Sequence, residues 1–472
     1  MTTLHIVHWA GSGPDSHRVS VSLEGEGLAP QEFGTEFAFT FPDEEQDQLR
    51  WYLEQYLQYP LDPAPERAHR AEEMMACLGE RLFRAVFCAD EDARDLWAML
   101  RTRLPETRVE VAGEHPRSWA LPWELLRDPK TQRYLALYAG EFVRTHPAPV
   151  QPVPLPKAAE GPIRVLLVIA RPRLEADVPY RSVARRVVAA LGGLEKVDVR
   201  LDVLRPPTFE ALADRLRRAK EAGTLYHVVH FDGHGMYEDL NPEDEEDRQK
   251  IGEWLKRLGT LVLGPTPIRG NGYLLFENPA VPENVRPVDG PTLGNLLVET
   301  GVGVLVLNAC RSARAAEELE EKVVQSEADR HGRVRAFGSL AQEVMDAGLA
   351  GVVAMRYNVY VVTAARFVAE LYAALARGRT LGQAVAAGRK QLGADPMRAI
   401  LYEPVSLQDW VVPLVYEAAP IRLFPPPSPL WGGLEGGGGM GGGGGPAARH
   451  AERGDRHPFG FAQGRPRTGR AG

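Results

Sequence analysis

The chain has 472 residues, of which 44% are hydrophobic and 25% charged, and its formal net charge is −8 at pH 7. This composition is typical of soluble globular protein and excludes both wholesale disorder and a membrane-embedded class. The acidic balance offers no general attraction for a polyanion, so we expect no nucleic-acid partner. The length predicts two globular units and a tail.

The first residues and the cysteines bear on the cellular compartment. The start, MTTLHIVH, lacks a basic region followed by a long apolar one, and no run is long enough to cross a bilayer. The three cysteines, Cys77, Cys88 and Cys310, cannot form a disulfide framework, and none lies in a C-x-x-C pair. Cys77 and Cys88 have apolar neighbours in a helical stretch, which favours the core for both. We expect a cytoplasmic protein with no membrane partner.

Residues 1–145 are predicted to form an N-terminal α+β region. Alternating apolar residues predict strands at 4–10, 18–23 and 36–41. Helical periodicity is present at 44–59, 66–87 and 90–104. The proline-rich segment 146–161, HPAPVQPVPLPKAAEG, is predicted to be a surface linker that marks a domain boundary.

Residues 162–424 have the pattern of an α/β domain. Short apolar runs alternate with helical stretches, which indicates a mostly parallel sheet with helices on both faces. Six runs are predicted to be strands, at 163–170, 197–204, 225–231, 302–307, 351–355 and 410–416. The helical stretches lie at 180–191, 208–222, 340–347 and 363–392, and the last is broken near Gly378.

Three segments interrupt or follow this alternation. The insertions 238–256 and 311–335 are too charged to be buried, so we expect both on the surface. Residues 425–472 contain GGLEGGGGMGGGGG and an Arg-rich end, which predict a disordered tail. These glycines are not a phosphate-binding loop, because no G-K-[ST] follows them and no strand precedes them.

Two strand ends carry side chains suited to catalysis. Ligands of open parallel sheets bind outside the carboxyl ends of the strands. The run 225–231 is followed by DGHG, which contains His234, and the run 304–307 is followed by NACRS, which contains Cys310. If the two strands are neighbours, about 5 Å apart, the imidazole and the thiol can meet.

A thiol beside an imidazole forms a nucleophile and base pair. The imidazole of His234 would take the proton of Cys310, since thiolate is the reactive form. The backbone N–H groups of Gly235 and Cys310 are candidates for an oxyanion hole. Either residue alone is more often structural, because a Cys after a buried strand is usually a core residue. Their joint position at two strand ends favours the catalytic interpretation.

Other polar residues near these ends have less specific interpretations. His227 and His230 lie within the strand, which favours packing or support of the site over catalysis. Asp232 is predicted to orient the site, to sense a basic substrate residue, or only to form a turn before glycine.

Several motifs together resemble a known family. YHVVHFDGHG at 226–235 and VLVLNACRSA at 304–313 resemble the His and Cys motifs of CHAT domains, the bacterial branch of the caspase–separase clan. LPWELL at 121–126 is similar to an early motif of CHAT proteins. Later elements of the family are similar to four segments of this chain, at residues 272–277, 339–356, 374–392 and 409–416. The resemblance covers roughly residues 121–416.

The resemblance implies a caspase-like, six-stranded fold and cysteine peptidase activity without a cofactor or metal. It assigns His234 as base, Cys310 as nucleophile, and Gly235 with Cys310 as the oxyanion hole. Relatives that cleave after Arg or Lys often have an Asp in the specificity pocket two residues before the Cys. Asn308 occupies that position here, so the substrate residue preferred before the cut stays open. Asp232 and Asn308 are candidates for orienting the site or lining the pocket.

The implied partners are a protein or peptide substrate and an activating sensor protein. CHAT proteins are often executioners switched on by a sensor, which suggests a bacterial regulatory, defence or cell-death system. The segment 311–335 is either an activation loop, cut at Arg330, Arg333 or Arg335, or a solvated charged helix.

Two rival functions stay open on the sequence alone. One is an interaction module with a degenerate site, although both His234 and Cys310 are present. The other is an unrelated α/β hydrolase or nucleotide-binding protein, which the absence of G-x-S-x-G, G-x-G-x-x-G and a P-loop disfavours. Residues 1–120 would sense a signal, hold the enzyme inactive or complete the fold.

Overall fold

The structure is a computed structural model of the chain. It describes residues 2–13, 15–25, 31–113, 121–145, 162–172, 199–237, 272–282, 284–308, 340–357, 359–399 and 403–424. The segments 146–161, 238–256, 311–335 and 425–472, for which a linker, two insertions and a tail are predicted, lie outside the described residues.

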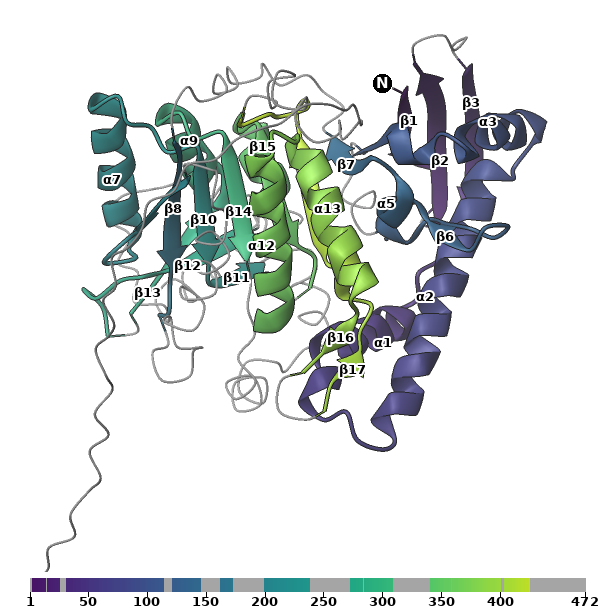
Figure 1. The fold of residues 1–472 in the computed structure, drawn as a ribbon, viewed down its shortest axis with the longest axis horizontal. Helices are drawn as coiled ribbons and strands as arrows, with labels where there is room; N and C mark the ends of the chain where they lie inside the picture. The colour runs from purple at the N-terminus through teal and green to yellow at the C-terminus, as the bar shows by residue number, and fades with distance from the viewer. Residues whose placement is uncertain are drawn as a thin grey trace, which may run out of the picture. The chain divides into compact units, whose positions relative to one another are not determined.

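One sheet of eleven strands organises the described part of the chain (Figure 1). Its order is β3-β2-β1-β4-β7-β18-β15-β14-β10-β8-β9. The strands are β1 (Thr2–Ala10), β2 (Ser16–Glu24), β3 (Gln31–Ala38), β4 (Thr107–Gly113), β7 (Glu141–Thr145), β8 (Ile163–Ile169), β9 (Val199–Val203), β10 (Val228–Asp232), β14 (Val304–Asn308), β15 (Gly351–Met355) and β18 (Pro413–Glu417).

Six of these strands come from residues 162–424, and they confirm the predicted mostly parallel sheet. β9, β8, β10, β14 and β15 are parallel neighbours, and β18 is antiparallel to β15. The predicted strand at 410–416 begins later, because Trp410 lies in the 3-10 helix η5 (Asp409–Val411). The predicted helix at 180–191 lies outside the described residues.

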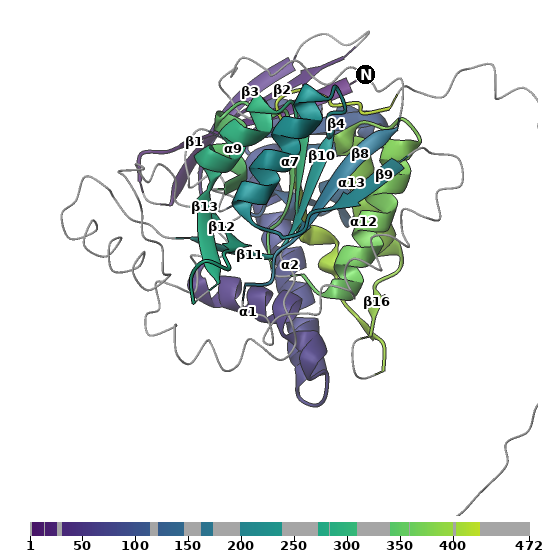
Figure 2. The same ribbon diagram turned by 90° about the vertical axis from the view of Figure 1, so that its left-hand side faces the viewer.

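Helices cover both faces of this sheet, as predicted. Figure 2 shows the strands between α7 (Phe209–Glu221) and α9 (Gly290–Glu299) on one side and α12 (Val361–Ala376) and α13 (Leu381–Ala394) on the other. Residues 340–346 form a further helix. Successive strand side chains point to opposite faces, so alternate residues of β10 and β14 enter two separate cores. Gly378, with φ +77°, separates α12 from α13, which confirms the predicted break.

The N-terminal residues extend the same sheet. Helices pack beside their strands, namely α1 (Asp43–Glu54), α2 (Ala64–Phe87), α3 (Glu91–Arg101) and α5 (Leu135–Tyr138), with short 3-10 turns η1 (Tyr56–Gln58) and η2 (Leu104–Glu106). The described residues also form two small hairpins, β5 (Arg127–Asp128) with β6 (Arg133–Tyr134), and β16 (Met397–Arg398) with β17 (Val405–Ser406). Two strands, β4 and β7, were not predicted, because charged residues interrupt their apolar pattern. The division into domains 1–145 and 162–424 stays a prediction.

The junction of β7 and β18, which we call the seam, joins the N-terminal strands to the other six. Tyr416 of β18 pairs in register with Arg144 of β7. Beside it, the buried guanidinium of Arg108 donates to the carboxylates of Glu141 and Glu417, at 2.9 Å from Nη1 to Oε2 for Glu417. Buried charge needs such partners, so the seam is held by ion pairs as well as by apolar packing.

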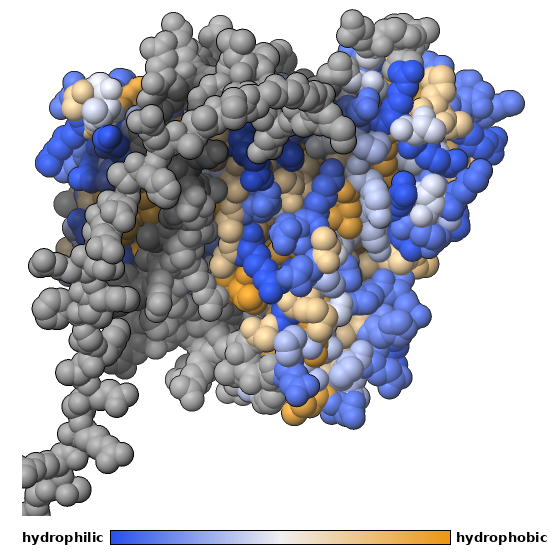
Figure 3. Space-filling model, viewed as in Figure 1, coloured by the Kyte–Doolittle hydropathy of each residue, from blue (hydrophilic) through white to orange (hydrophobic). Residues whose placement is uncertain are grey.

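The face drawn in Figure 3 is mostly polar over the N-terminal elements. Figure 3 shows hydrophilic residues there, with hydrophobic residues in small groups. Among the described residues, no helix combines the length and hydropathy needed to span a membrane.

Candidate functional site

The two strands that lead to the predicted dyad are neighbours. β10 and β14 pair in parallel, with Asp232 in register with Asn308. In the sequence, His234 lies two residues after Asp232, and Cys310 lies two residues after Asn308. Cys310 itself lies outside the described residues. The adjacency on which the predicted pairing depends is therefore present at the carboxyl edge of the sheet.

His234 lies where the large sheet passes into a small one. It is half-buried and begins β11 (His234–Tyr237), which pairs with β12 (Gly272–Glu277), and β12 pairs with β13 (Val285–Asp289). Gly235, the predicted oxyanion donor, is in register with Leu274 of β12. The imidazole is thus carried on a strand that follows the end of β10 after a single residue.

That single residue is Gly233, and its lack of a side chain is needed. A Cβ there would lie 2.7 Å from Cε1 of Phe231 and 3.3 Å from the carbonyl oxygen of Ala170. Its N–H donates to the carbonyl oxygen of Asn308 at 3.1 Å. The glycine therefore allows the chain before His234 to lie close to β8 and β14.

Asp232 is fully buried and ion-paired. Its carboxylate accepts from Nη2 of Arg171, and its main-chain oxygen accepts from Nη1 of Arg171 at 2.9 Å. Nδ2 of Asn308 lies 3.5 Å from the other carboxylate oxygen. Arg171 follows β8 and was not predicted as a site residue. Ligands of parallel sheets bind outside the carboxyl ends of the strands, and this rule, which indicated His234, applies to Arg171 as well.

Asn308 is 3% exposed. Within the described part of the chain, its Oδ1 has no hydrogen-bond partner. A buried polar atom without a partner is costly in free energy and needs an explanation, such as a bound water, an ion or a functional role. This observation keeps Asn308 a candidate for lining a substrate pocket.

The two histidines inside the strand region make structural contacts. Nδ1 of His227 accepts from the backbone N–H of Arg164 at 3.0 Å. His230 is fully buried with Nδ1 3.2 Å from the hydroxyl of Tyr372. Burial lowers the pKa of His230 to about 4, although Asp232 acts in the opposite direction. Burial, assisted by the charge of Arg164, also lowers the pKa of His227, so the neutral form is favoured for both histidines, in agreement with the packing role predicted for them.

The core prediction for Cys77 is wrong. The buried stripe of α2 includes Ala71, Met75, Leu78 and Leu82, and Cys77 lies off this stripe and is exposed. Cys88, at the end of the helix, is half-buried and packs against the core. Apolar neighbours in sequence do not decide which side of a helix a residue occupies.

The LPWELL segment lies at the seam. Trp123 is buried in the 3-10 helix η3 (Trp123–Leu125), as the sequence predicts. Both oxygens of the Glu124 carboxylate accept from Arg144, at 2.9 and 2.7 Å, and Arg356 lies 3.7 Å away. Burial alone raises the pKa of Glu124, but the charges of Arg144, Arg389 and Arg356 outweigh it and hold the pKa at about 2. No local pattern in the sequence indicated this role of Glu124.

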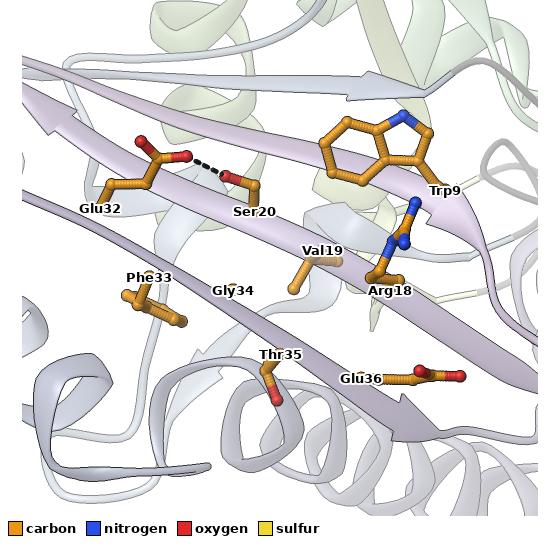
Figure 4. Close-up of a pocket in the computed structure, with 9 residues that line it drawn as sticks. All are labelled: Trp9, Arg18, Val19, Ser20, Glu32, Phe33, Gly34, Thr35 and Glu36. Atoms are coloured by element: carbon orange, nitrogen blue, oxygen red, sulfur yellow. Dashed lines mark hydrogen bonds between the residues drawn. The ribbon is translucent and has the colours of Figure 1, made fainter.

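A cavity of about 610 Å³ lies elsewhere, on the N-terminal strands β1, β2 and β3 (Figure 4). Its lining residues are Trp9, Arg18, Val19, Ser20, Glu32, Phe33, Gly34, Thr35 and Glu36. Five strands lie between β1 and β10 in the sheet, which corresponds to roughly 29 Å. The cavity is therefore separate from His234. No group of three or more His, Cys, Asp or Glu residues suited to a metal ion occurs among the described residues.

The fold and site define an α/β protein with a histidine at the carboxyl edge of a mostly parallel sheet, beside a strand that leads to a cysteine. The profile of the CHAT domain matches residues 78–420, more than half of the chain, so the chain belongs to the CHAT domain family. No curated protein matches it. Among solved structures it is similar to a chain of the Saccharomyces cerevisiae separase–securin complex, with 12% identity and a TM-score of 0.31 over 83% of this chain. It spans 21% of that longer chain.

Proposed function

We propose that this CHAT-domain protein is a cysteine endopeptidase that hydrolyses peptide bonds in protein substrates with Cys310 as nucleophile and His234 as base. The observation that carries the proposal is the parallel register of Asp232 with Asn308, because each catalytic residue follows that pair by two residues. We further propose that the enzyme acts in the cytoplasm of a bacterium, in a regulatory, defence or cell-death system with an activating sensor.

The reaction has two stages. His234 takes the thiol proton of Cys310, and the thiolate sulfur attacks the scissile carbonyl carbon. The N–H groups of Gly235 and Cys310 donate to the oxyanion, and the imidazolium returns the proton to the leaving amine as the C–N bond breaks. Water then gives a proton to His234 while its oxygen bonds to the carbonyl carbon. The C–S bond breaks, which releases the acid and restores the thiolate and imidazolium.

The test compares the purified full-length chain with Cys310→Ala and His234→Ala variants. Each is incubated with a proteome-derived peptide library, and cleavage sites are identified by mass spectrometry. We expect cuts by the wild type that are lost in both variants, with a fall in rate of at least about 100-fold for the loss of the base. The residue before each cut also reveals the specificity.

Thiol labelling supplies an independent readout. Iodoacetamide labelling of Cys310 is compared with that of Cys77, an exposed thiol in the same chain. We expect faster labelling of Cys310 that depends on His234, because an adjacent imidazole increases the thiolate fraction. No cuts, together with labelling of Cys310 that His234→Ala does not change, would overturn the proposal in favour of an inactive scaffold.

A further inference from the structure

We propose that Arg171 is a positioning residue for His234, which it holds through the end of β10. This inference rests on the proposed function, since it assigns Arg171 a part in the same site. Arg171 is 8% exposed and lies two residues after the end of β8, the strand beside β10. Its side chain and its backbone each contact an element that borders His234.

The guanidinium joins the ends of β8 and β10. Nη1 donates to the carbonyl oxygens of Ala170, at 2.8 Å, and Asp232, at 2.9 Å, and Nη2 donates to the carboxylate of Asp232. The N–H of Ala170 also donates to the Asp232 carbonyl at 3.0 Å. A planar guanidinium donates in several fixed directions, so it fixes the orientation of Asp232 as well as neutralising its charge.

The backbone of the same residue contacts the small sheet. The N–H of Arg171 donates to Oε1 of Glu277 at 2.9 Å, and Glu277 is the last residue of β12. β12 pairs with β11, which begins at His234. Arg171 therefore contacts the segment before His234 and also the strand that pairs with the segment after it.

The β14 side supplies the opposite support. The N–H of Gly233 donates to the carbonyl of Asn308, and Nδ2 of Asn308 lies near the Asp232 carboxylate. The turn that carries His234 thus lies between Arg171 on one side and Asn308 on the other. Loss of Arg171 would leave Asp232 buried without its guanidinium partner and would release one of these two supports.

The pairing also bears on which substrate side chain the site accepts. A buried carboxylate near the dyad is an obvious partner for a basic substrate residue, but the Asp232 carboxylate already binds Arg171. Its charge is therefore balanced within the fold. We infer that Asp232 supports the turn and does not act as a receptor for a substrate Lys or Arg.

The experiment measures kcat and KM separately for full-length Arg171→Met and Arg171→Lys, using the best peptide from the wild-type cleavage sites. A displacement of the base of about 1 Å lowers the rate roughly 100-fold, so we expect Arg171→Met to lower kcat about 10- to 100-fold and to change KM less than threefold. Arg171→Lys restores the positive charge but not the planar guanidinium with its several N–H donors, so we expect partial recovery of kcat.

A matched control and a double-mutant cycle separate a role in positioning His234 from a non-specific disturbance of the fold. Arg205 also contacts the end of β8, with Nη1 3.3 Å from the carbonyl of Ile169, and we expect Arg205→Met to leave kcat within about twofold. If Arg171 acts through Asp232, Asp232→Asn and Arg171→Met lower kcat together by less than the product of their separate effects. Thermal melting checks the folding of each variant, and Arg171→Lys carries the test if Arg171→Met melts below the assay temperature.

The outcomes distinguish the two proposals. If His234→Ala abolishes activity and Arg171→Met does not lower kcat, the positioning role is wrong and the dyad stands. Equal losses of kcat in Arg171→Met and Arg205→Met would also overturn the positioning role. If His234→Ala changes neither cleavage nor the labelling of Cys310, the proposed function fails, and the inference fails with it.

Discussion

Two regions of the sheet bury charged groups, and they differ in where those groups come from. At the seam of β7 and β18, Glu124 pairs with Arg144, and Arg108 pairs with Glu141 and Glu417. At the carboxyl edge of β10 and β14, the buried pair is Arg171 with Asp232. The seam pairs join neighbouring strands to one another and, through Glu124, to the 3-10 helix η3. The edge pair lies beside a half-buried histidine that follows a strand end.

The difference shows that buried charge alone does not identify a catalytic site. Both regions contain strong ion pairs, and at the seam the charges of Arg144, Arg389 and Arg356 lower the pKa of Glu124 to about 2. Location separates them, because only the edge lies where parallel sheets bind ligands. Substitutions at the seam should therefore change stability, and substitutions at the edge should change catalysis.

The largest expected effect on stability is that of Glu124→Ala. This change leaves the buried guanidinium of Arg144 without its carboxylate, so we expect a loss of about 3–5 kcal/mol in the free energy of unfolding, measured by urea denaturation. The control is Glu66→Ala, which removes an exposed pair with Arg70 and should cost less than about 1 kcal/mol. Equal losses in the two variants would contradict a structural role for the seam.

The next effect is a pH dependence from Glu417. Burial raises the pKa of Glu417 to about 7, with Glu141 adding to the rise and Arg108 opposing it. The folded state therefore holds a proton that the unfolded state has lost above a pH of about 4.3. Its contribution is fully present below that pH and is lost as the pH rises to about 7, by up to about 3 kcal/mol.

The measurement is the free energy of unfolding of wild type and Glu417→Gln across pH 4.5 to 7.5. We expect the variant to lack the decline with rising pH that Glu417 causes, because Gln has no proton to lose. A difference between the two proteins that is constant with pH would mean that Glu417 does not titrate in this range.

The smallest effect comes from His230 and has the opposite sign. Its pKa is lowered to about 4 by burial, so between about 4 and 6.5 the unfolded state binds a proton that the folded state does not. Stability should then rise with pH across this window, by roughly 1–3 kcal/mol. His230→Gln should remove this rise in the same unfolding experiment. An unchanged slope would show that His230 is not the titrating group.

The sequence predicted the carboxyl edge better than the seam for a physical reason. The strands that lead to His234 and Cys310 are mostly apolar runs, and His227 and His230 are the polar residues of the first. The rule for ligand sites in parallel sheets applies to each strand end by itself. That was enough to predict the six strands and the adjacent ends. The local signal did not indicate that Arg171 would pair with Asp232, because the partners are 61 residues apart, and Arg171 follows β8 whereas Asp232 ends β10.

The seam depends on contacts that no local pattern encodes. Glu124 and Arg144 are 20 residues apart, and Arg108 and Glu417 are 309 apart. In a single sequence, charged residues inside β4 and β7 weaken the apolar alternation that indicates a strand. Their partners become known only when the strands are assembled, so the pairing of β7 with β18 could not be predicted.

The position of β18 has a consequence for synthesis of the chain on the ribosome. β18 lies between β7 and β15 in the sheet, although it is the last of the eleven strands in sequence. The nascent N-terminal strands therefore have no neighbour to join on that side until residues 413–417 have been translated. Such long-range pairing is slow to form. A ribosome-bound chain that already contains His234 and Cys310 would still lack this strand, so completion of the sheet follows synthesis of both residues of the proposed dyad.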